Sequence, residues 1–228
     1  MTALVTGLLA MSVGAVVGVG THRLNQRLGR GEEEATVPPL PGEPFWAPVL
    51  DAAALGFLFF RYGVSPRSLA AALLLVVLVQ VFVFDTRHRL ILNKVMYPSI
   101  VVALLTCPIN PLLQADNGFG KLDSALLGAV VGGGIFFVLV IFSRGGVGLG
   151  DAKLTFLLGA ALGFLPIPTS PIIWALIYGI IVGGVAAAFL LVSRVRGMRD
   201  FIPYGPFLCL GGAAAVLLPC GLLGPASC

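Results

Sequence analysis

Eight long apolar segments run through this chain and constrain its fold more than any other feature. Such segments are long enough to cross a bilayer, which takes about 20 residues of α-helix. The composition agrees, because only 11% of the residues are charged, whereas about a quarter are charged in a soluble domain. We therefore expect an all-α, polytopic integral membrane protein with about eight transmembrane helices. The segments run roughly over Leu4–Gly20, Ala47–Phe60, Ser68–Phe84, Val95–Leu113, Ser124–Phe142, Ala152–Phe164, Pro171–Val192 and Pro203–Leu223.

The sixth and seventh segments are separated by a predicted turn. No charged residue occurs between Lys153 and Arg194, and this stretch is too long for one span. Pro166, Pro168 and Pro171 interrupt it, and prolines end helices. Two spans are therefore expected where hydropathy alone would give one.

The distribution of basic residues supports the count of eight. With eight spans, eleven of the 14 Lys and Arg residues lie in the loops on one side of the membrane. Basic loops face the cytoplasm, so both termini are expected outside. The eleven residues are Arg23, Arg27, Arg30, Arg87, Arg89, Lys94, Arg144, Lys153, Arg194, Arg196 and Arg199. We treat residues 1–228 as one membrane-embedded domain, with a short cytoplasmic loop at about 21–46.

Two aspartates are placed at the same face by this topology. Asp85 ends the third span and Asp151 precedes the sixth, so both are expected at the cytoplasmic side. The sixth span has about 13 residues, which reach about 20 Å against a hydrocarbon core of about 30 Å. Ionisable groups near hydrocarbon are costly and are usually retained for a function, with a partner nearby.

Each aspartate also has a simpler interpretation. Asp151 could be a helix cap, since Asp is favoured at helix N-termini. Capping does not require the glycines around it, which are Gly145, Gly146, Gly148 and Gly150. Asp85 could be an interfacial residue paired with Arg87 or Arg89. Asp85 is a functional candidate because it is expected on the same side of the membrane as Asp151.

Two carboxyl groups held close together share a proton, so one can act as a base and the other as an acid. No serine or cysteine has a convincing histidine partner, and His22 and His88 are interpreted as solvated surface groups. The four cysteines have no Cys-x-x-Cys spacing, so no metal site is expected. Asp51 and Gln80 lie near or within spans and are expected to bond between helices. The net charge of +4 reflects loop arginines and indicates no nucleic-acid partner.

The motifs around these residues resemble those of the type IV prepilin peptidases, GxGD-type aspartic peptidases of the bacterial inner membrane. The segment 148–154, Gly-Leu-Gly-Asp-Ala-Lys-Leu, is similar to the family's GxGDxKL element. Asp85 with Ile91-Leu92-Asn93 resembles its first catalytic element, with Leu92 in place of proline. Residues 201–208 resemble its C-terminal IPFGPFL stretch, and residues 47–51 resemble a YPLVE-like segment.

The resemblance implies an endopeptidase that removes the leader from pilin-like or pseudopilin precursors at the cytoplasmic face. Asp85 and Asp151 would be catalytic. Gly148, Gly150, Lys153 and Asn93 would shape the backbone or the substrate site. The implied partners are the lipid bilayer and precursors with an apolar N-terminal helix, and no cofactor is implied. Many members carry two Cys-x-x-Cys pairs in the first cytoplasmic loop and also N-methylate the product, but this loop has no cysteine.

Two other functions use the same residues. A small transporter could use Asp85 and Asp151 as a proton or cation relay, since broken helices with acidic residues are found in transporters. A catalytically silent assembly scaffold would need neither acid. Loss of precursor processing in Asp→Asn variants would favour the peptidase over both alternatives.

Overall fold

The structure of the protein is a computed structural model that describes residues 2–29, 43–88, 91–110, 112–113, 120–143, 147–165, 170–193 and 204–218. These residues form eight α-helices and no strand. The helices are α1 (Thr2–Gly29), α2 (Glu43–Tyr62), α3 (Pro66–His88), α4 (Asn93–Leu105), α5 (Lys121–Phe142), α6 (Leu149–Leu162), α7 (Pro171–Val192) and α8 (Gly205–Leu217). The predicted all-α polytopic fold is confirmed. Helices α1, α2, α3, α5 and α7 are long and apolar enough to cross a membrane.

Most of the predicted boundaries hold to within a few residues, and the ends of α1 and α4 are the main exceptions. The prediction carried this segment to Leu113, but α4 ends at Leu105 and turns through Thr106 to Ile109. Pro108 explains the early end, because a proline disfavours helical backbone at the residue that precedes it. The break between the sixth and seventh segments is confirmed, with α6 ending at Leu162 and α7 beginning at Pro171.

The predicted loop at about 21–46 is shorter than expected. Helix α1 continues to Gly29 and α2 begins at Glu43, and the residues between them lie outside the described part of the chain. His22 was predicted to be solvated, and this was wrong, since the residue is only 7% exposed. The prediction ended the first helix at Gly20 and placed His22 in a loop, whereas α1 continues past His22 to Gly29.

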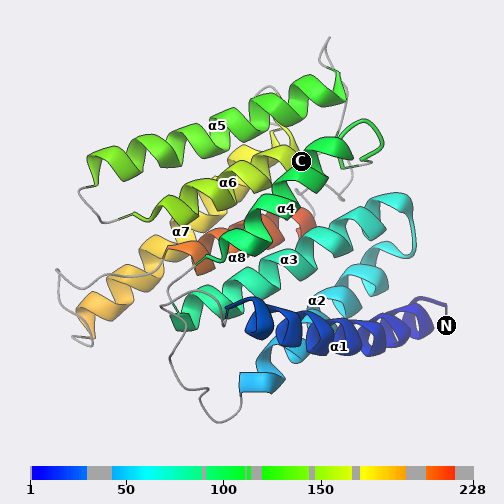
Figure 1. Ribbon diagram of the computed structural model, residues 1–228. Coiled ribbons are helices and arrows are strands. Elements are labelled where there is room, and N and C mark those ends of the chain that lie inside the picture. The colour runs from blue at the N-terminus through cyan, green and yellow to red at the C-terminus, as the bar shows by residue number, and fades with distance from the viewer. Residues whose placement is uncertain are drawn as a thin grey trace.

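Three pairs of consecutive helices are each held together by glycine. Between α1 and α2, a Cβ atom on Gly18 would lie 2.6 Å from Cα of Pro48. Between α5 and α6, Gly128 and Gly159 bring their backbones into direct contact, and Gly211 of α8 does the same against α7. Small residues let membrane helices approach this closely. Figure 1 shows α1 beside α2 on one flank and α5 beside α6 on the other.

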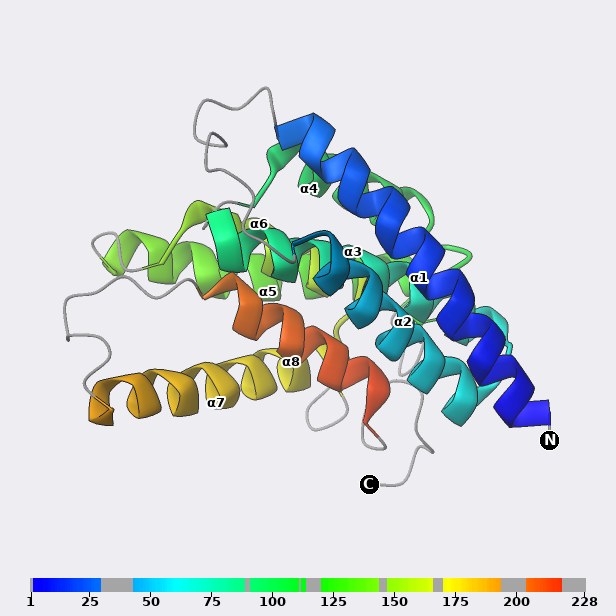
Figure 2. The same ribbon diagram turned by 90° about the horizontal axis from the view of Figure 1, so that it is seen from below.

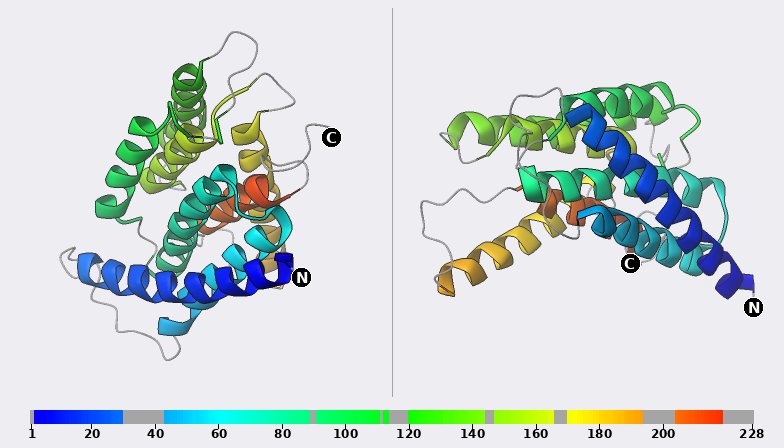
Figure 3. Two further views of the ribbon diagram at one scale, coloured as in Figure 1. Left: turned by 90° about the vertical axis from the view of Figure 1, so that its right-hand side faces the viewer. Right: turned by 60° about the horizontal axis from the view of Figure 1, so that its bottom comes forward.

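Helices α3, α6 and α8 form the centre of the bundle. Helix α3 packs against α8 and α2, and α6 packs against α5, α4, α8 and α7. Viewed from below, α8 lies between α7 and α3 (Figure 2). Helix α7 is angled away from the remaining helices (Figure 3). The most enclosed helix is the short α6, which is buried along nearly its whole length.

A buried polar contact joins α2 to α3. Nε2 of Gln80 donates a 2.9 Å hydrogen bond to Oδ2 of Asp51, and both side chains are buried. The predicted interhelical bond is confirmed. It fixes α3 against α2 five residues before Asp85, which belongs to the candidate site.

Candidate active site

Asp151 lies in the first turn of α6 and is 6% exposed. Its Oδ2 atom accepts a 3.2 Å hydrogen bond from the backbone N–H of Gly148. Asp123 caps α5 in the same way, accepting a 3.2 Å hydrogen bond from Gly120, but Asp123 is exposed. The interpretation of Asp151 as the helix N-cap is wrong, because Gly148 is the N-cap and Asp151 is the third residue of α6, from which its Oδ2 atom bonds back to the N-cap backbone. The other oxygen, Oδ1, lies towards Gly205 at the start of α8.

Asp85 lies in the last turn of α3 and is 4% exposed. Its Oδ2 atom is buried and has no hydrogen-bond partner among the described residues. The side chains of Arg87 and Arg89, which were considered as its ion-pair partners, lie outside the described part of the chain. Burying a carboxyl oxygen without a donor is costly. Such a group in a native fold calls for an explanation.

The two aspartates meet at Gly205, the first residue of α8. A Cβ atom on Gly205 would collide with Oδ2 of Asp85 and would lie 3.2 Å from Oδ1 of Asp151. The Cγ atom of Asp85 is 3.1 Å from the same point. Because both groups lie about 3 Å from one position, they are within about 6 Å of each other, where carboxyl groups influence each other's ionisation. The predicted convergence of Asp85 and Asp151 is what the structure shows.

The start of α8 completes this cluster, and sequence reasoning missed it. Tyr204 precedes the helix, and its ring packs 5.8 Å from the ring of Phe136 on α5 and 6.2 Å from that of Phe207. The available signal was the glycine before Pro206 in an otherwise bulky stretch, since only glycine leaves room for two carboxyl groups.

The two predicted glycines next to Asp151 have distinct positions. Gly148 supplies the N–H that caps Asp151, and it adopts an ordinary extended backbone. Gly150 packs against Ile91, whose side-chain atoms lie 3.0 to 3.2 Å from the place of a Cβ atom. Gly150 therefore lets α6 lie close to the segment that joins α3 to α4.

Lys153 and Asn93 are brought together, but not with the aspartates. The Nζ atom of Lys153 donates a 2.7 Å hydrogen bond to Oδ1 of Asn93. The same Nζ atom lies 4.9 Å from the centre of the Tyr97 ring. Both partners are on the first turns of α4, so Lys153 ties the beginning of α4 to α6. Lys153 is two positions after Asp151 in the helix, so the two side chains lie on different sides of α6.

The chemistry available to this cluster is that of two coupled carboxyl groups. Doubly ionised carboxylates at this separation repel, so a single shared proton is favoured. One group then acts as a base and the other as an acid. Among the described residues no group of three or more His, Cys, Asp or Glu side chains could hold a metal ion. Cys107 and Cys209 are buried and free, whereas Cys220 and Cys228 lie outside the described residues.

Fold and site together define a multi-pass membrane protein with a pair of buried carboxyl groups near the ends of two of its helices. Residues 72–192 match the model of the type IV leader peptidase family. The chain belongs to this family. The matched region contains both aspartates and ends with α7.

The names of curated relatives also describe leader peptidases. A prepilin leader peptidase/N-methyltransferase of Neisseria gonorrhoeae is 30% identical over 169 residues, covering 72% of this chain and 54% of the relative. Proteins of the same name from Stutzerimonas stutzeri and Bacillus subtilis (strain 168) are 26% and 28% identical, covering 71% and 69% of this chain. The chain spans about half the length of these relatives, at 54% and 58%. No solved structure matches the chain.

Proposed function

We propose that this protein is a prepilin leader peptidase, an aspartic endopeptidase of the bacterial plasma membrane. It cleaves the leader from type IV pilin-like or pseudopilin precursors at the cytoplasmic face, with both termini of the chain outside. Membership of the leader peptidase family and the names of the relatives support the peptidase over a transporter that uses the same acids. The two carboxyl groups of the site support an aspartic mechanism.

The observation that carries the proposal is the meeting of Asp85 and Asp151 at Gly205. The two acids come from α3 and α6, which are separated in sequence by α4 and α5. A capping role explains Oδ2 of Asp151 but leaves the buried Oδ2 atom of Asp85, which has no partner among the described residues, unexplained. A proton shared with Asp151 accounts for this oxygen.

In the proposed mechanism, the two aspartates have different protonation states. Asp151 accepts a hydrogen bond from Gly148, which favours its ionised form, whereas Oδ2 of Asp85 has no donor. Asp151 therefore removes a proton from a water molecule, and Asp85 donates its proton to the carbonyl oxygen of the scissile peptide. The water oxygen bonds to the carbonyl carbon as these protons move, which gives a gem-diol. When the C–N bond breaks, Asp151 donates the proton it took from water to the leaving nitrogen, and Asp85 takes a proton back from a diol hydroxyl, so both carboxyl groups return to their starting states.

The remaining predicted site residues act around the pair. Gly148 holds Asp151 through its N–H, and Gly150 lets the segment at Ile91 approach. Lys153 and Asn93 join α6 to α4 and position the aspartates indirectly. We propose no methyltransferase activity for the described helices. The short first loop lacks the cysteine pairs that accompany that activity in many members.

The test is co-expression of a pilin-like precursor with Asp85→Asn or Asp151→Asn. Either substitution keeps the size of the side chain and removes the acid, so we expect processing to fall by at least about a thousandfold. Asp123→Asn is the matched control, because Asp123 caps a helix with the same geometry but is exposed. Undiminished processing by either Asp85→Asn or Asp151→Asn would rule out the dyad. Equal losses in all three variants would indicate that capping alone matters.

A further inference from the structure

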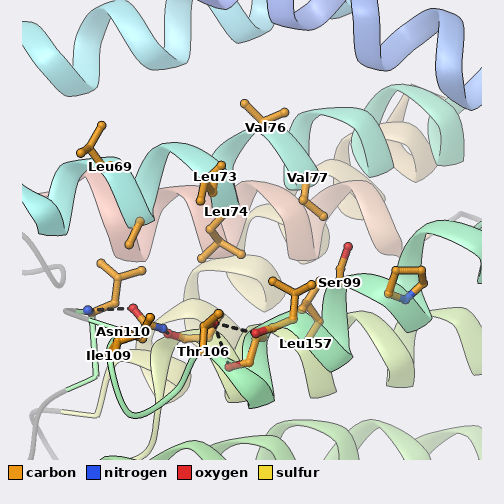
Figure 4. A pocket seen from close by; sticks show the side chains of 16 residues that line it. Leu69, Leu73, Leu74, Val76, Val77, Ser99, Thr106, Ile109, Asn110 and Leu157 are labelled. Carbon is orange, nitrogen blue, oxygen red and sulfur yellow. Dashed lines mark hydrogen bonds between the residues drawn. The ribbon is translucent and has the colours of Figure 1, made fainter.

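A cavity of about 550 Å³ lies between α3 and α4 and is also lined by α6. Its volume is within the range of ligand sites, about 300–1,000 Å³. Figure 4 shows Leu73 and Leu74 of α3 on one side, with Thr106 and Ile109 of the α4 end on the other. Helix α6 contributes Leu157 and Ala161 to the cavity. We refer to this cavity as the α3–α4 groove.

The groove exists because two consecutive helices pack against different neighbours. Helix α3 packs mainly against α8 and α2, whereas α4 packs mainly against α6. The turn that follows α4 is held there by Asn110, whose Nδ2 atom donates a 3.2 Å hydrogen bond to the Ala161 carbonyl. The near end is held by the bond between Lys153 and Asn93. Both ends of α4 are thus tied to α6, and the side facing α3 stays open.

The groove is aligned with the two aspartates. Helices α3 and α6 run in opposite directions, because Asp85 ends one and Asp151 begins the other. Groove residues precede Asp85 on α3 and follow Asp151 on α6, so both helices lead from the acids in the same direction. Val77 is about 12 Å along α3 from Asp85, and Leu157 is about 9 Å along α6 from Asp151. A chain cleaved at the acids would therefore enter the groove one to two helical turns further on.

The lining suits an apolar helix. Ala70, Ser99, Ala103 and Ala161 are small, and small residues allow the backbone of another membrane helix to approach. The hydroxyl groups are already satisfied within α4, since Ser99 donates to the Val95 carbonyl and Thr106 to that of Val102. What remains is an almost wholly apolar surface. Leu73 on α3 is 73% exposed at this surface, although the helix on which it lies is central to the bundle.

We infer that the α3–α4 groove binds the apolar helix that follows the scissile bond of the precursor. This inference rests on the proposed function, because it takes the aspartates as the cleavage point. The groove would hold the helix beside α6 while the leader remains outside the membrane, so that the peptide at the acids is placed by contacts one to two turns away. Because the groove binds the helix equally before and during the reaction, this contact lowers KM for the precursor and leaves kcat unchanged.

The first experiment fills the groove in the full-length protein. Leu73→Trp and Ala103→Trp place an indole in the groove, and Val130→Trp places one on α5, where Val130 is 62% exposed and outside the groove. Two substrates are compared: a precursor with its apolar helix, and a soluble peptide that ends shortly after the scissile bond. For the groove variants we expect KM for the precursor to rise about tenfold with kcat unchanged. Cleavage of the soluble peptide should be unchanged, and Val130→Trp should match the unmodified protein with both substrates.

The outcomes separate the two proposals. Groove variants that process the precursor with an unchanged KM would overturn the inference and leave the peptidase intact. If the unmodified protein cleaves neither substrate, the proposed function fails. A photo-crosslinking arm then decides on binding alone, with benzoylphenylalanine at position 73 in the Asp85→Asn protein. An adduct with the precursor supports the groove, whereas adducts with lipid alone or with a second copy of the chain overturn it.

Discussion

Nζ of Lys153 lies 2.7 Å from Oδ1 of Asn93, so the lysine that follows the acidic motif is directed towards α4 and not towards Asp151. Lys153→Met removes this bond and the contact with the Tyr97 ring. We expect a loss of about 1 kcal/mol in the free energy of unfolding, together with a several-fold fall in kcat. A double-mutant cycle with Asn93→Ala measures the coupling. Strictly additive effects of the two substitutions would show that the bond is not formed in the membrane.

Gly205 leaves the space in which the two acids meet. A methyl group in Gly205→Ala would displace Asp85 and press on Asp151, and small displacements of catalytic groups are costly. We expect activity to fall by about a hundredfold. Gly184→Ala on α7 is the control, because nothing lies within 4 Å of a Cβ atom there. Initial rates of precursor cleavage by both variants provide the measurement, and full activity of Gly205→Ala would contradict this arrangement of the site.

The hydrogen bond between Asp51 and Gln80 makes a different prediction, which concerns stability. Asp51→Leu leaves the Gln80 amide without this partner in a buried position, which costs about 1–3 kcal/mol. Asp51→Leu combined with Gln80→Leu removes both polar groups, so part of the loss should be recovered. Thermal unfolding in detergent compares these two variants with the unmodified protein. A double variant less stable than Asp51→Leu alone would show that Gln80 contributes mainly through other contacts.

Close packing of α5 on α6 sets the position of Asp151. In Gly128→Ala the new methyl group would collide with the carbonyl of Gly159, so α6 must shift. We expect the free energy of unfolding to fall by about 1–3 kcal/mol. Activity should fall with it, because the shift of α6 moves Asp151. Gly134→Ala, also on α5, meets nothing within 4 Å and should be neutral or more stable by up to about 1 kcal/mol. If the two variants unfold at the same temperature, the α5–α6 contact is not as close as described.

Helix number and the pairing of the two acids could be predicted because both depend on local patterns. Apolar runs mark the helices, and the basic loops place Asp85 and Asp151 on one side. The contact at Gly205 could not be predicted this way, since it depends on how α8 packs against α3 and α6. The same holds for Lys153, whose sequence position beside Asp151 suggests a contact that the helical periodicity prevents. The end of α4 was misjudged because hydropathy continues past Pro108 although the helix does not.

The α8 contribution to the site has a consequence for biosynthesis. The two acids belong to α3 and α6, but the glycine that closes them off begins the last described helix. During translation, earlier hairpins can enter the bilayer and pair through their own glycines before this helix emerges from the ribosome. A nascent chain would therefore carry both carboxyl groups without the enclosure that couples them. In the proposed peptidase, cleavage would begin only after this helix has inserted.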